Sequence, residues 1–205
     1  MSKIYQLDNL EITWLGHASF KIKTPQSIIY IDPYNVVGGE KADLILVTHG
    51  HHDHKDEKSI GVLSTSETEI LVGGESVREG EKKEIKGVKI KTVPAYNVNK
   101  FRAPGNPYHP RGTGVGFIIE AAGQKIYHAG DTDKIPEMAN LGEIDLALLP
   151  IGGTYTMDEE EAAEAVKTIK PKRVIPMHYG TLAETPGQPE KFKELVGDTS
   201  EVIIL

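Results

Sequence analysis

The chain has 205 residues, 39% hydrophobic and 26% charged, as is typical of a globular protein with one compact core. Its formal net charge of −7 argues against a nucleic-acid backbone as the main partner, because phosphate binding needs clustered Lys and Arg. The absence of cysteine excludes thiolate metal sites, so a transition metal would need His nitrogens and carboxylate oxygens. The sequence shows neither a signal-peptide pattern nor an apolar run of about 18 residues, so we expect a cytoplasmic protein.

The first third of the chain favours short strands and one helix. Strands are expected at residues 11–15, 20–23 and 27–31, which are β-rich runs separated by turn residues. Residues 44–48 form a continuous apolar run, as expected for a strand buried on both faces. Residues 57–64 are expected to form a short helix.

The middle of the chain continues with strands at residues 70–72 and 88–93. Residues 94–113 are rich in Pro and Gly and show no periodicity. This composition predicts a long ordered loop, and loops of such length within a compact domain usually carry function. Residues 114–120 and 125–128 are expected to form a β-hairpin.

Residues 158–170 carry the clearest helix signal. Asp158 stands at the N-cap position, Glu161 completes a capping box, and Pro171 ends the helix. The other elements expected in this half are a short helix at 133–141, strands at 145–149, 174–177 and 202–205, and a helix at 189–196.

Two segments of the chain resemble each other. Residues 42–50 and 144–152 both read as a buried strand followed by a glycine-containing loop. This similarity predicts two related halves packed face to face, with sites at the strand ends. No linker interrupts the chain, so we expect a single domain over residues 1–205.

A histidine-rich motif begins where the apolar run 44–48 ends. His49, His51, Asp53 and His54 provide three imidazoles and a carboxylate within six residues, which suits Zn, Fe, Mn or Ni. His49 and His51 can face one metal centre, and Asp53 and His54 a second one nearby. His52 is expected to point away from both. A solvated His-rich loop is the alternative interpretation.

Three residues elsewhere are candidates to complete two such centres. Asp131 and His178 each follow an expected strand, and a carboxylate at position 131 could bridge two ions. His109 lies in the long loop. The alternatives are an Asx turn or helix cap for Asp131, a structural core histidine for His178 and an ordinary surface residue for His109.

The combined motifs resemble the metallo-β-lactamase-fold superfamily. They are the 49–54 motif, Gly130-Asp131-Thr132 and Pro176-Met177-His178-Tyr179-Gly180. The opening Thr13-Trp14-Leu15-Gly16-His17-Ala18-Ser19-Phe20 and Ile31-Asp32-Pro33 resemble a compact branch related to the ascorbate-6-phosphate lactonase. The resemblance implies a four-layer αββα sandwich of two mixed sheets, with the metal site at one sheet edge.

The resemblance also implies a ligand set. His49 and His51 would bind the first metal, Asp53, His54 and His178 the second, and Asp131 would bridge them. Many members have a further histidine just after the strand that ends in Val-Pro-Ala, but this chain has Tyr96 and Asn97 there. His109 is therefore assigned as the third ligand of the first metal.

Four further residues are expected near the site or behind it. The resemblance places His17 near the metal pocket, with burial beneath the first strands as the alternative, and gives Asp32 the role of orienting a ligand histidine. Either Asp32 or Asp133 could fix the tautomer of such a histidine. His128 could support the site or face the opposite side of its strand.

The predicted function is metal-dependent hydrolysis of an ester-like bond, such as a lactone, ester or phosphodiester, in a small soluble substrate. Two divalent ions, Zn first with Mn, Fe or Ni as alternatives, can hold a hydroxide between them, and Asp131 and Asp53 are the candidate catalytic residues. Asp53 could carry the proton to the leaving group. Lys100, Arg102 and Arg111 in the long loop could favour an anionic substrate, and a solvated loop with scattered cations is the alternative interpretation. The alternatives are a nuclease of the same superfamily, a redox iron protein with a flavin partner, or a metal-binding module without turnover.

Overall fold

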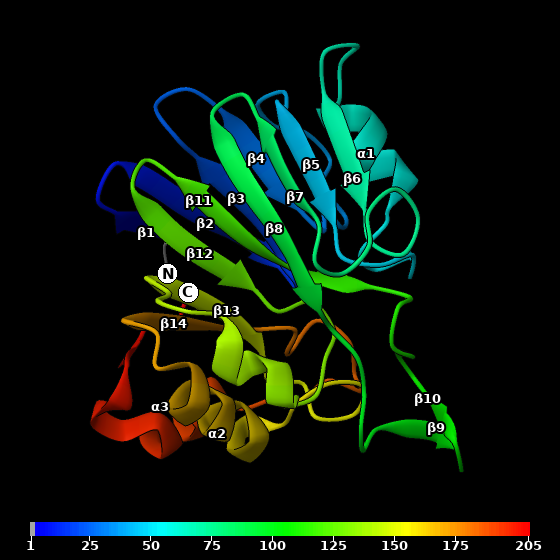
Figure 1. Cartoon of the computed structure of the whole chain (residues 1–205), viewed down its shortest axis with the longest axis vertical. Coiled ribbons are helices and arrows are strands. Elements are labelled where there is room, and N and C mark those ends of the chain that lie inside the picture. The colour runs from blue at the N-terminus through cyan, green and yellow to red at the C-terminus, as the bar shows by residue number, and fades with distance from the viewer. Residues whose placement is uncertain (1–2) are drawn as a thin grey trace.

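The computed structural model describes residues 3–205 and contains two large mixed β-sheets (Figure 1). The first sheet has six strands in sequence order. Its first four strands run antiparallel to their neighbours, whereas β5 and β6 are added in parallel. The strands are β1 (Ile4–Leu7), β2 (Leu10–Gly16), β3 (Ser19–Lys23), β4 (Ile28–Ile31), β5 (Leu44–Val47) and β6 (Glu69–Val72).

The second sheet repeats this arrangement. Its order is β15-β14-β13-β12-β11-β8-β7, antiparallel from β7 to β12 and parallel from β12 to β15. The strands are β7 (Lys82–Ile85), β8 (Val88–Pro94), β11 (Val115–Ala121), β12 (Gln124–His128), β13 (Leu146–Pro150), β14 (Arg173–Met177) and β15 (Glu201–Val202). The strands β5 and β13, which carry the similar sequence segments, thus occupy comparable places in the two sheets.

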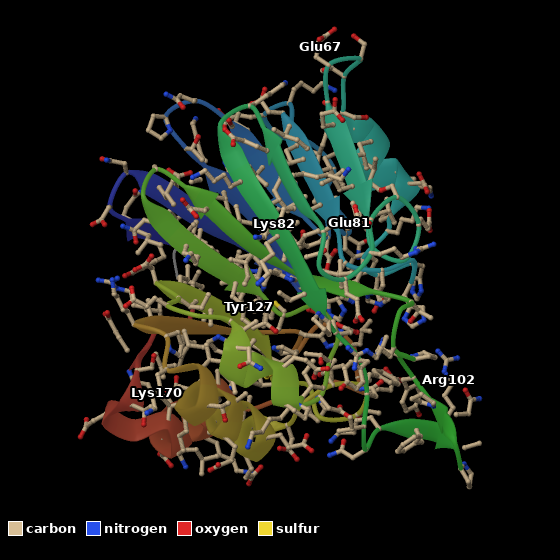
Figure 2. The ribbon with its side chains drawn as sticks, viewed as in Figure 1. Glu67, Glu81, Lys82, Arg102, Tyr127 and Lys170 are labelled. Carbon is tan, nitrogen blue, oxygen red and sulfur yellow. The ribbon has the colours of Figure 1, made fainter. Side chains whose placement is uncertain are left out.

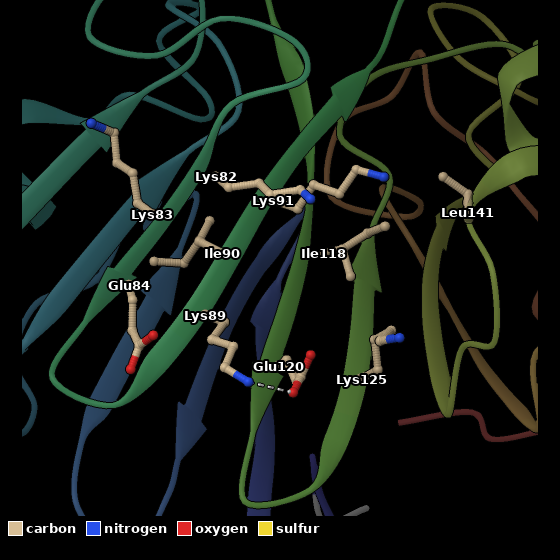
Figure 3. Close-up of a pocket in the computed structure, with 10 residues that line it drawn as sticks. All are labelled: Lys82, Lys83, Glu84, Lys89, Ile90, Lys91, Ile118, Glu120, Lys125 and Leu141. Atoms are coloured by element: carbon tan, nitrogen blue, oxygen red, sulfur yellow. Dashed lines mark hydrogen bonds and ion pairs between the residues drawn. The ribbon is translucent and has the colours of Figure 1, made fainter.

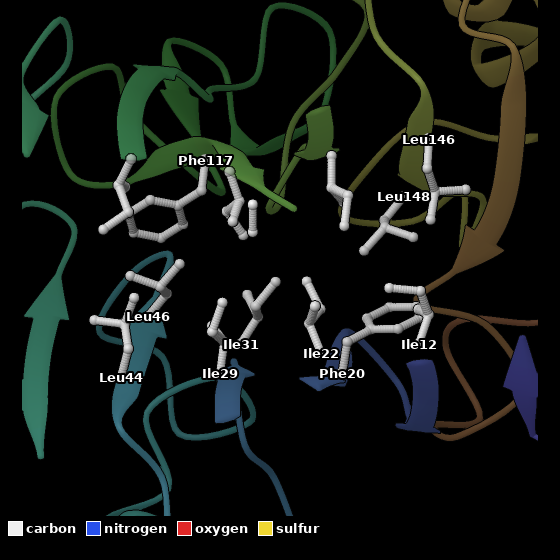
Figure 4. Close-up of a cluster of buried hydrophobic side chains, with 14 of the residues drawn as sticks. Ile12, Phe20, Ile22, Ile29, Ile31, Leu44, Leu46, Phe117, Leu146 and Leu148 are labelled. Carbon is white, nitrogen blue, oxygen red and sulfur yellow. The ribbon is translucent and has the colours of Figure 1, made fainter. Parts of the chain in front are cut away.

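The largest core lies between the two sheets. Figure 4 shows Phe20 and Leu46 of the first sheet facing Phe117 and Leu148 of the second. These four side chains are fully buried. Each Å² of apolar surface removed from water contributes roughly 25 cal/mol, so this packing stabilises the fold and holds the strand ends in place.

Helices cover the outer faces of both sheets. The helix α1 (Glu57–Leu63) packs through Ile60 and Leu63 on the first sheet. The helices α2 (Glu159–Ile169) and α3 (Pro189–Val196) pack on the second, together with the 3-10 helix η1 (Pro136–Asn140). The order helix, sheet, sheet, helix confirms the predicted αββα class. A further 3-10 turn, η2 (Gly197–Thr199), precedes β15.

The chemistry of the α2 N-terminus is as predicted. The Asp158 side chain accepts a hydrogen bond from the Glu161 amide at 2.9 Å, and the Glu161 carboxylate accepts one from the Asp158 amide at 3.1 Å. The helix ends at Ile169, followed by Lys170 in a left-handed conformation and Pro171. None of the helices in the described part of the chain has the length and apolar character needed to cross a membrane.

Several elements differ from the sequence-based prediction. The strands β1 and β7 were not expected. Polar residues dominate Lys82–Ile85 of β7, and an edge strand tolerates such residues. The predicted helix at residues 133–141 is instead the five-residue η1. The loop at 94–113 contains a small hairpin of β9 (Phe101–Ala103) and β10 (Asn106–Pro107), which projects from the body (Figure 1).

Candidate metal centre

The candidate site lies where strands of both sheets end. His49 follows β5, Asp131 follows β12 and His178 follows β14. An isolated β-bridge between His49 and Gly114 joins the two sheets at this edge. A Cβ at Gly114 would lie 2.9 Å from the His49 Cβ, so only glycine permits this close approach.

One group of donors consists of His49, His51 and His109. Their candidate ligand atoms all lie within 4.8 Å of one another, and His49 Nε2 is 3.0 Å from His51 Nδ1. His49 and His109 are buried, whereas His51 is partly exposed. The structure therefore places His109 from the long loop beside the two histidines of the motif.

The second group consists of Asp53, His54, His178 and the early residue His17, again within 4.8 Å. Asp131 lies between the two groups. One of its oxygens, Oδ1, is 3.3 Å from His54 Nε2. The other, Oδ2, is 3.3 Å from His109 Nε2 and 3.1 Å from His178 Nε2. The single carboxylate of Asp131 thus faces both groups.

The donor atoms are arranged as metal ligands would be. His54 Nε2, His178 Nε2 and Asp131 Oδ1 are buried and have no hydrogen-bond partner among the described residues. Buried polar atoms are rarely left unpaired in folded proteins, because each costs about 1–3 kcal/mol. Imidazole nitrogens and carboxylate oxygens in this number fit divalent transition metals, so these residues fit metal binding.

Asp32 holds the second group from behind. It is fully buried, and its Oδ2 lies 2.7 Å from His54 Nδ1 and accepts a hydrogen bond from Thr48 Oγ1 at 2.7 Å. Its Oδ1 accepts from the Thr48 amide at 2.7 Å. A carboxylate on Nδ1 keeps the proton there and leaves the lone pair of His54 Nε2 free to bind metal. The expected orienting role of Asp32 agrees with this geometry.

Asn97 holds the first group in a similar way. Its Oδ1 lies 2.9 Å from His109 Nδ1 and accepts from the His109 amide at 2.7 Å. Its Nδ2 donates to Asp133 Oδ1 at 2.8 Å, and Asp133 Oδ2 accepts from the amides of Val98 and Asn99. Asp133 therefore acts on His109 through Asn97 and does not contact a ligand histidine. Asn97 was not expected as a functional residue.

His17 belongs to the site through Asp53. Its Nε2 lies 3.1 Å from Asp53 Oδ2, and its ring lies 3.9 Å from the His178 ring, centroid to centroid. His17, Asp32 and His178 all have a left-handed backbone, with φ of 53°, 45° and 57°. Such conformations are uncommon outside glycine and cluster at functional sites.

Burial and charge set the protonation of the donors. Burial lowers the pKa of His49 well below its usual value and that of His109 to about 4, so both are neutral at pH 7. Burial also opposes a charge on His54, but the Asp131 and Asp32 carboxylates outweigh it and raise the pKa of His54 well above normal. Burial raises the pKa of Asp131, yet His178 and His54 hold it well below its usual range. Asp131 is therefore a carboxylate at neutral pH.

Two other histidines lie outside the donor groups. The side chain of His52 is 86% exposed, as expected of a residue that points away from the site. His128 is fully buried, with its Nε2 2.9 Å from the Ala18 carbonyl, while its Nδ1 accepts from the Gly130 amide. His128 therefore ties β12 to the first sheet beneath the site.

A cavity of about 470 Å³ opens onto the donors. It is lined by His51, His52, Asp53, Arg102, Tyr108, His109, Asp131, Tyr155, Leu182 and Glu184. A second large cavity, of about 520 Å³, lies on the second sheet among Lys82, Lys91 and Lys125 (Figure 3). It contains no histidine and none of the donor carboxylates. The first cavity, by contrast, is lined by residues of both donor groups and by Asp131, so it can present a substrate to the whole site.

Two stacked mixed sheets with a His/Asp cluster at one edge define a protein of the metallo-β-lactamase type. Residues 11–178 match the model of the β-lactamase superfamily domain. The chain is 39% identical to a UPF0173 metal-dependent hydrolase of Thermococcus onnurineus and 38% identical to one of Methanopyrus kandleri, with 96% of each chain covered in both comparisons.

Solved structures agree with this relationship. A candidate metal-dependent hydrolase from Parabacteroides distasonis superimposes with a TM-score of 0.87 at 33% identity, covering 100% of this chain and 97% of the other. The metallo hydrolase Igni18 from Ignicoccus hospitalis gives 0.74 at 27% identity, covering 96% and 94%. The chain belongs to the β-lactamase superfamily and, within it, to the UPF0173 metal-dependent hydrolases.

Proposed function

We propose that this metal-dependent hydrolase binds two divalent ions, with Zn as the first choice, and cleaves an ester-like bond in a small soluble substrate. The observation that carries the proposal is the position of Asp131, whose two oxygens face the histidines of both donor groups. His49, His51 and His109 would bind one ion, and Asp53, His54 and His178 the other, with Asp131 bridging.

Divalent ions, when bound, supply Lewis acidity and make water nucleophilic at neutral pH. Asp53 is the residue of this chain placed to move protons, because it lines the cavity and also belongs to the second donor group. Burial raises the pKa of Asp53, but the hydrogen bond from His17 and the charge of His54 outweigh it and hold the pKa well below normal. An ionised Asp53 can accept the proton of the attacking water and pass it to the leaving group.

The cavity favours a small substrate over a polynucleotide. Its volume of about 470 Å³ is in the range of small-molecule sites. Arg102 is the only Lys or Arg that lines it within residues 3–205. A nuclease would need several cations along such a surface to hold consecutive phosphates, so we favour the lactone, ester or phosphodiester class of small substrate.

A substrate panel tests this proposal. Protein loaded with Zn, Mn, Fe or Ni should hydrolyse at least one small lactone, carboxylic ester or phosphodiester. Asp53→Asn should lower kcat by about 10²–10⁴-fold, as expected for loss of a group that transfers protons. Asp198→Asn, at an exposed position away from the site, is the control. The absence of hydrolysis with every metal, or full kcat in Asp53→Asn, would contradict the proposal.

A further inference from the structure

Three cations of the long loop could bind an anionic substrate, and the structure separates them. Arg111 pairs with Glu137 at 2.8 Å and with Glu79 at 3.2 Å. Lys100 pairs with Glu161 at 2.6 Å. Arg102 has no carboxylate partner in the part of the chain that the structure describes. Its charge is therefore the one left available to a ligand.

Arg102 lies at the cavity that opens onto the donor groups. It stands on β9 of the projecting hairpin (Figure 2) and lines the same cavity as Asp53 and Asp131. Its guanidinium lies over the Tyr108 ring, 5.3 Å from the centroid, and the Tyr108 ring contacts the Tyr155 ring edge to face at 4.9 Å. Stacking on an aromatic face orients the guanidinium and leaves its N–H groups free to donate.

We propose that Arg102 binds an anionic oxygen group of the substrate, a carboxylate or a phosphate remote from the scissile bond. Tyr108 and Tyr155 would contact the apolar or aromatic part of the same molecule. This inference rests on the proposed function, because it places the anion in the cavity where hydrolysis would occur. The planar guanidinium can donate two parallel hydrogen bonds to such a group, which selects for oxygen anions over neutral groups.

Two other charged residues near the site affect where an anion could bind. Glu184 also lines the cavity and would repel an anion placed on its side, so the anion should sit on the Arg102 side. Arg78 lines a neighbouring cavity that touches His49, His51 and His109 but neither Asp53 nor Asp131. A substrate that reached the first donor group alone would depend on Arg78, and this outcome can be measured.

Equilibrium binding of two non-hydrolysable probes tests the inference. Phenylphosphonate represents a phosphate-like anion and phenylacetate a carboxylate, each on an aromatic ring. Benzyl alcohol is the neutral control. Calorimetric titration of the metal-loaded protein should show binding of at least one anion, weakened about tenfold in Arg102→Gln, which corresponds to about 1.4 kcal/mol. Arg111→Gln and Arg78→Gln should retain the wild-type Kd. Benzyl alcohol should bind wild type and Arg102→Gln equally.

The outcomes separate this inference from the proposed function. Equal anion Kd values in Arg102→Gln and wild type, a larger loss in Arg78→Gln, or no binding of either anion to wild type would overturn the role of Arg102. Metal content and the unfolding midpoint of Arg102→Gln should equal those of wild type, since Arg102 is exposed on the hairpin. Because the probes are not hydrolysed, a protein that binds them but cleaves no ester would contradict only the proposed function.

Discussion

The replacement Asp32→Asn tests how the second donor group is held. Asp32 is fully buried and makes three contacts of 2.7 Å, to the Thr48 amide, to Thr48 Oγ1 and to His54 Nδ1. Asparagine has nearly the same volume and can still accept from the Thr48 amide. Its NH₂ group, however, is a donor and cannot accept the hydrogen bond from His54 Nδ1–H.

The expected consequence is a change of tautomer. Facing an NH₂ donor, His54 should carry its proton on Nε2, the atom that faces Asp131 at 3.3 Å. Removing such a support typically lowers metal affinity by about 10–100-fold, which corresponds to about 1.4–2.7 kcal/mol. Loss of the charge-assisted hydrogen bond should also lower the free energy of unfolding of the metal-free protein by about 2 kcal/mol.

Competition with a chromophoric chelator measures the two metal affinities separately. Asp32→Asn should weaken most the ion held by His54. The ion held by His49 and His109 should weaken less, because Asp32 reaches His49 only through Thr48 Oγ1, which lies 3.0 Å from His49 Nδ1. Asn97→Ala is the matched variant, because Asn97 orients His109 in the first group. It should produce the opposite pattern. Unchanged affinities in Asp32→Asn, or equal weakening of both ions in both variants, would refute this account of how the site is held.

Two further predictions concern stability. Phe117→Ala should lower the free energy of unfolding by about 3–5 kcal/mol in urea denaturation, because the ring is fully buried between the sheets; a loss below 1 kcal/mol would contradict that position. The free energy of unfolding of the metal-free protein should fall as the pH is lowered from about 6.5 to about 4. The reason is that burial lowers the pKa of His49, His51 and His109, the last to about 4. The unfolded chain then binds protons that the folded chain does not, and His109→Gln should reduce this loss by about 3 kcal/mol at pH 4. A level profile across this window would oppose the reasoning.

The sequence was sufficient to predict the parts of the site that depend on local order. His49 and His51 directly follow an apolar run that forms a strand buried on both faces, and Asp131 and His178 also follow buried strands. Strands stacked in two sheets bring their ends to one edge, so residues that follow them meet. The buried strands and the capped helix α2 were predictable from strong local patterns, whereas the αββα order was implied by the family resemblance.

The parts of the site that depend on contacts between residues far apart in the sequence could not be predicted from local patterns. Asn97 supports His109 across 12 positions of an irregular loop, and Asp133, which lies between β12 and η1, binds that loop through Asn97. The hydrophobic periodicity of the sequence carries no information about such contacts. The hairpin β9–β10 escaped prediction because its strands are two and three residues long and contain Pro107. The place of His17 beside Asp53 follows from the turn between β2 and β3, whose direction only the packed sheets define.

Metal content per chain is the measurement that tests the central claim most directly. Elemental mass spectrometry of the purified protein, with protein concentration from amino-acid analysis, should give two divalent ions per chain. His109→Gln and His178→Gln should each reduce this to one, because each removes a ligand from a different group. One ion or none in wild type, or two retained in both variants, would contradict the assignment of two metal sites joined by Asp131.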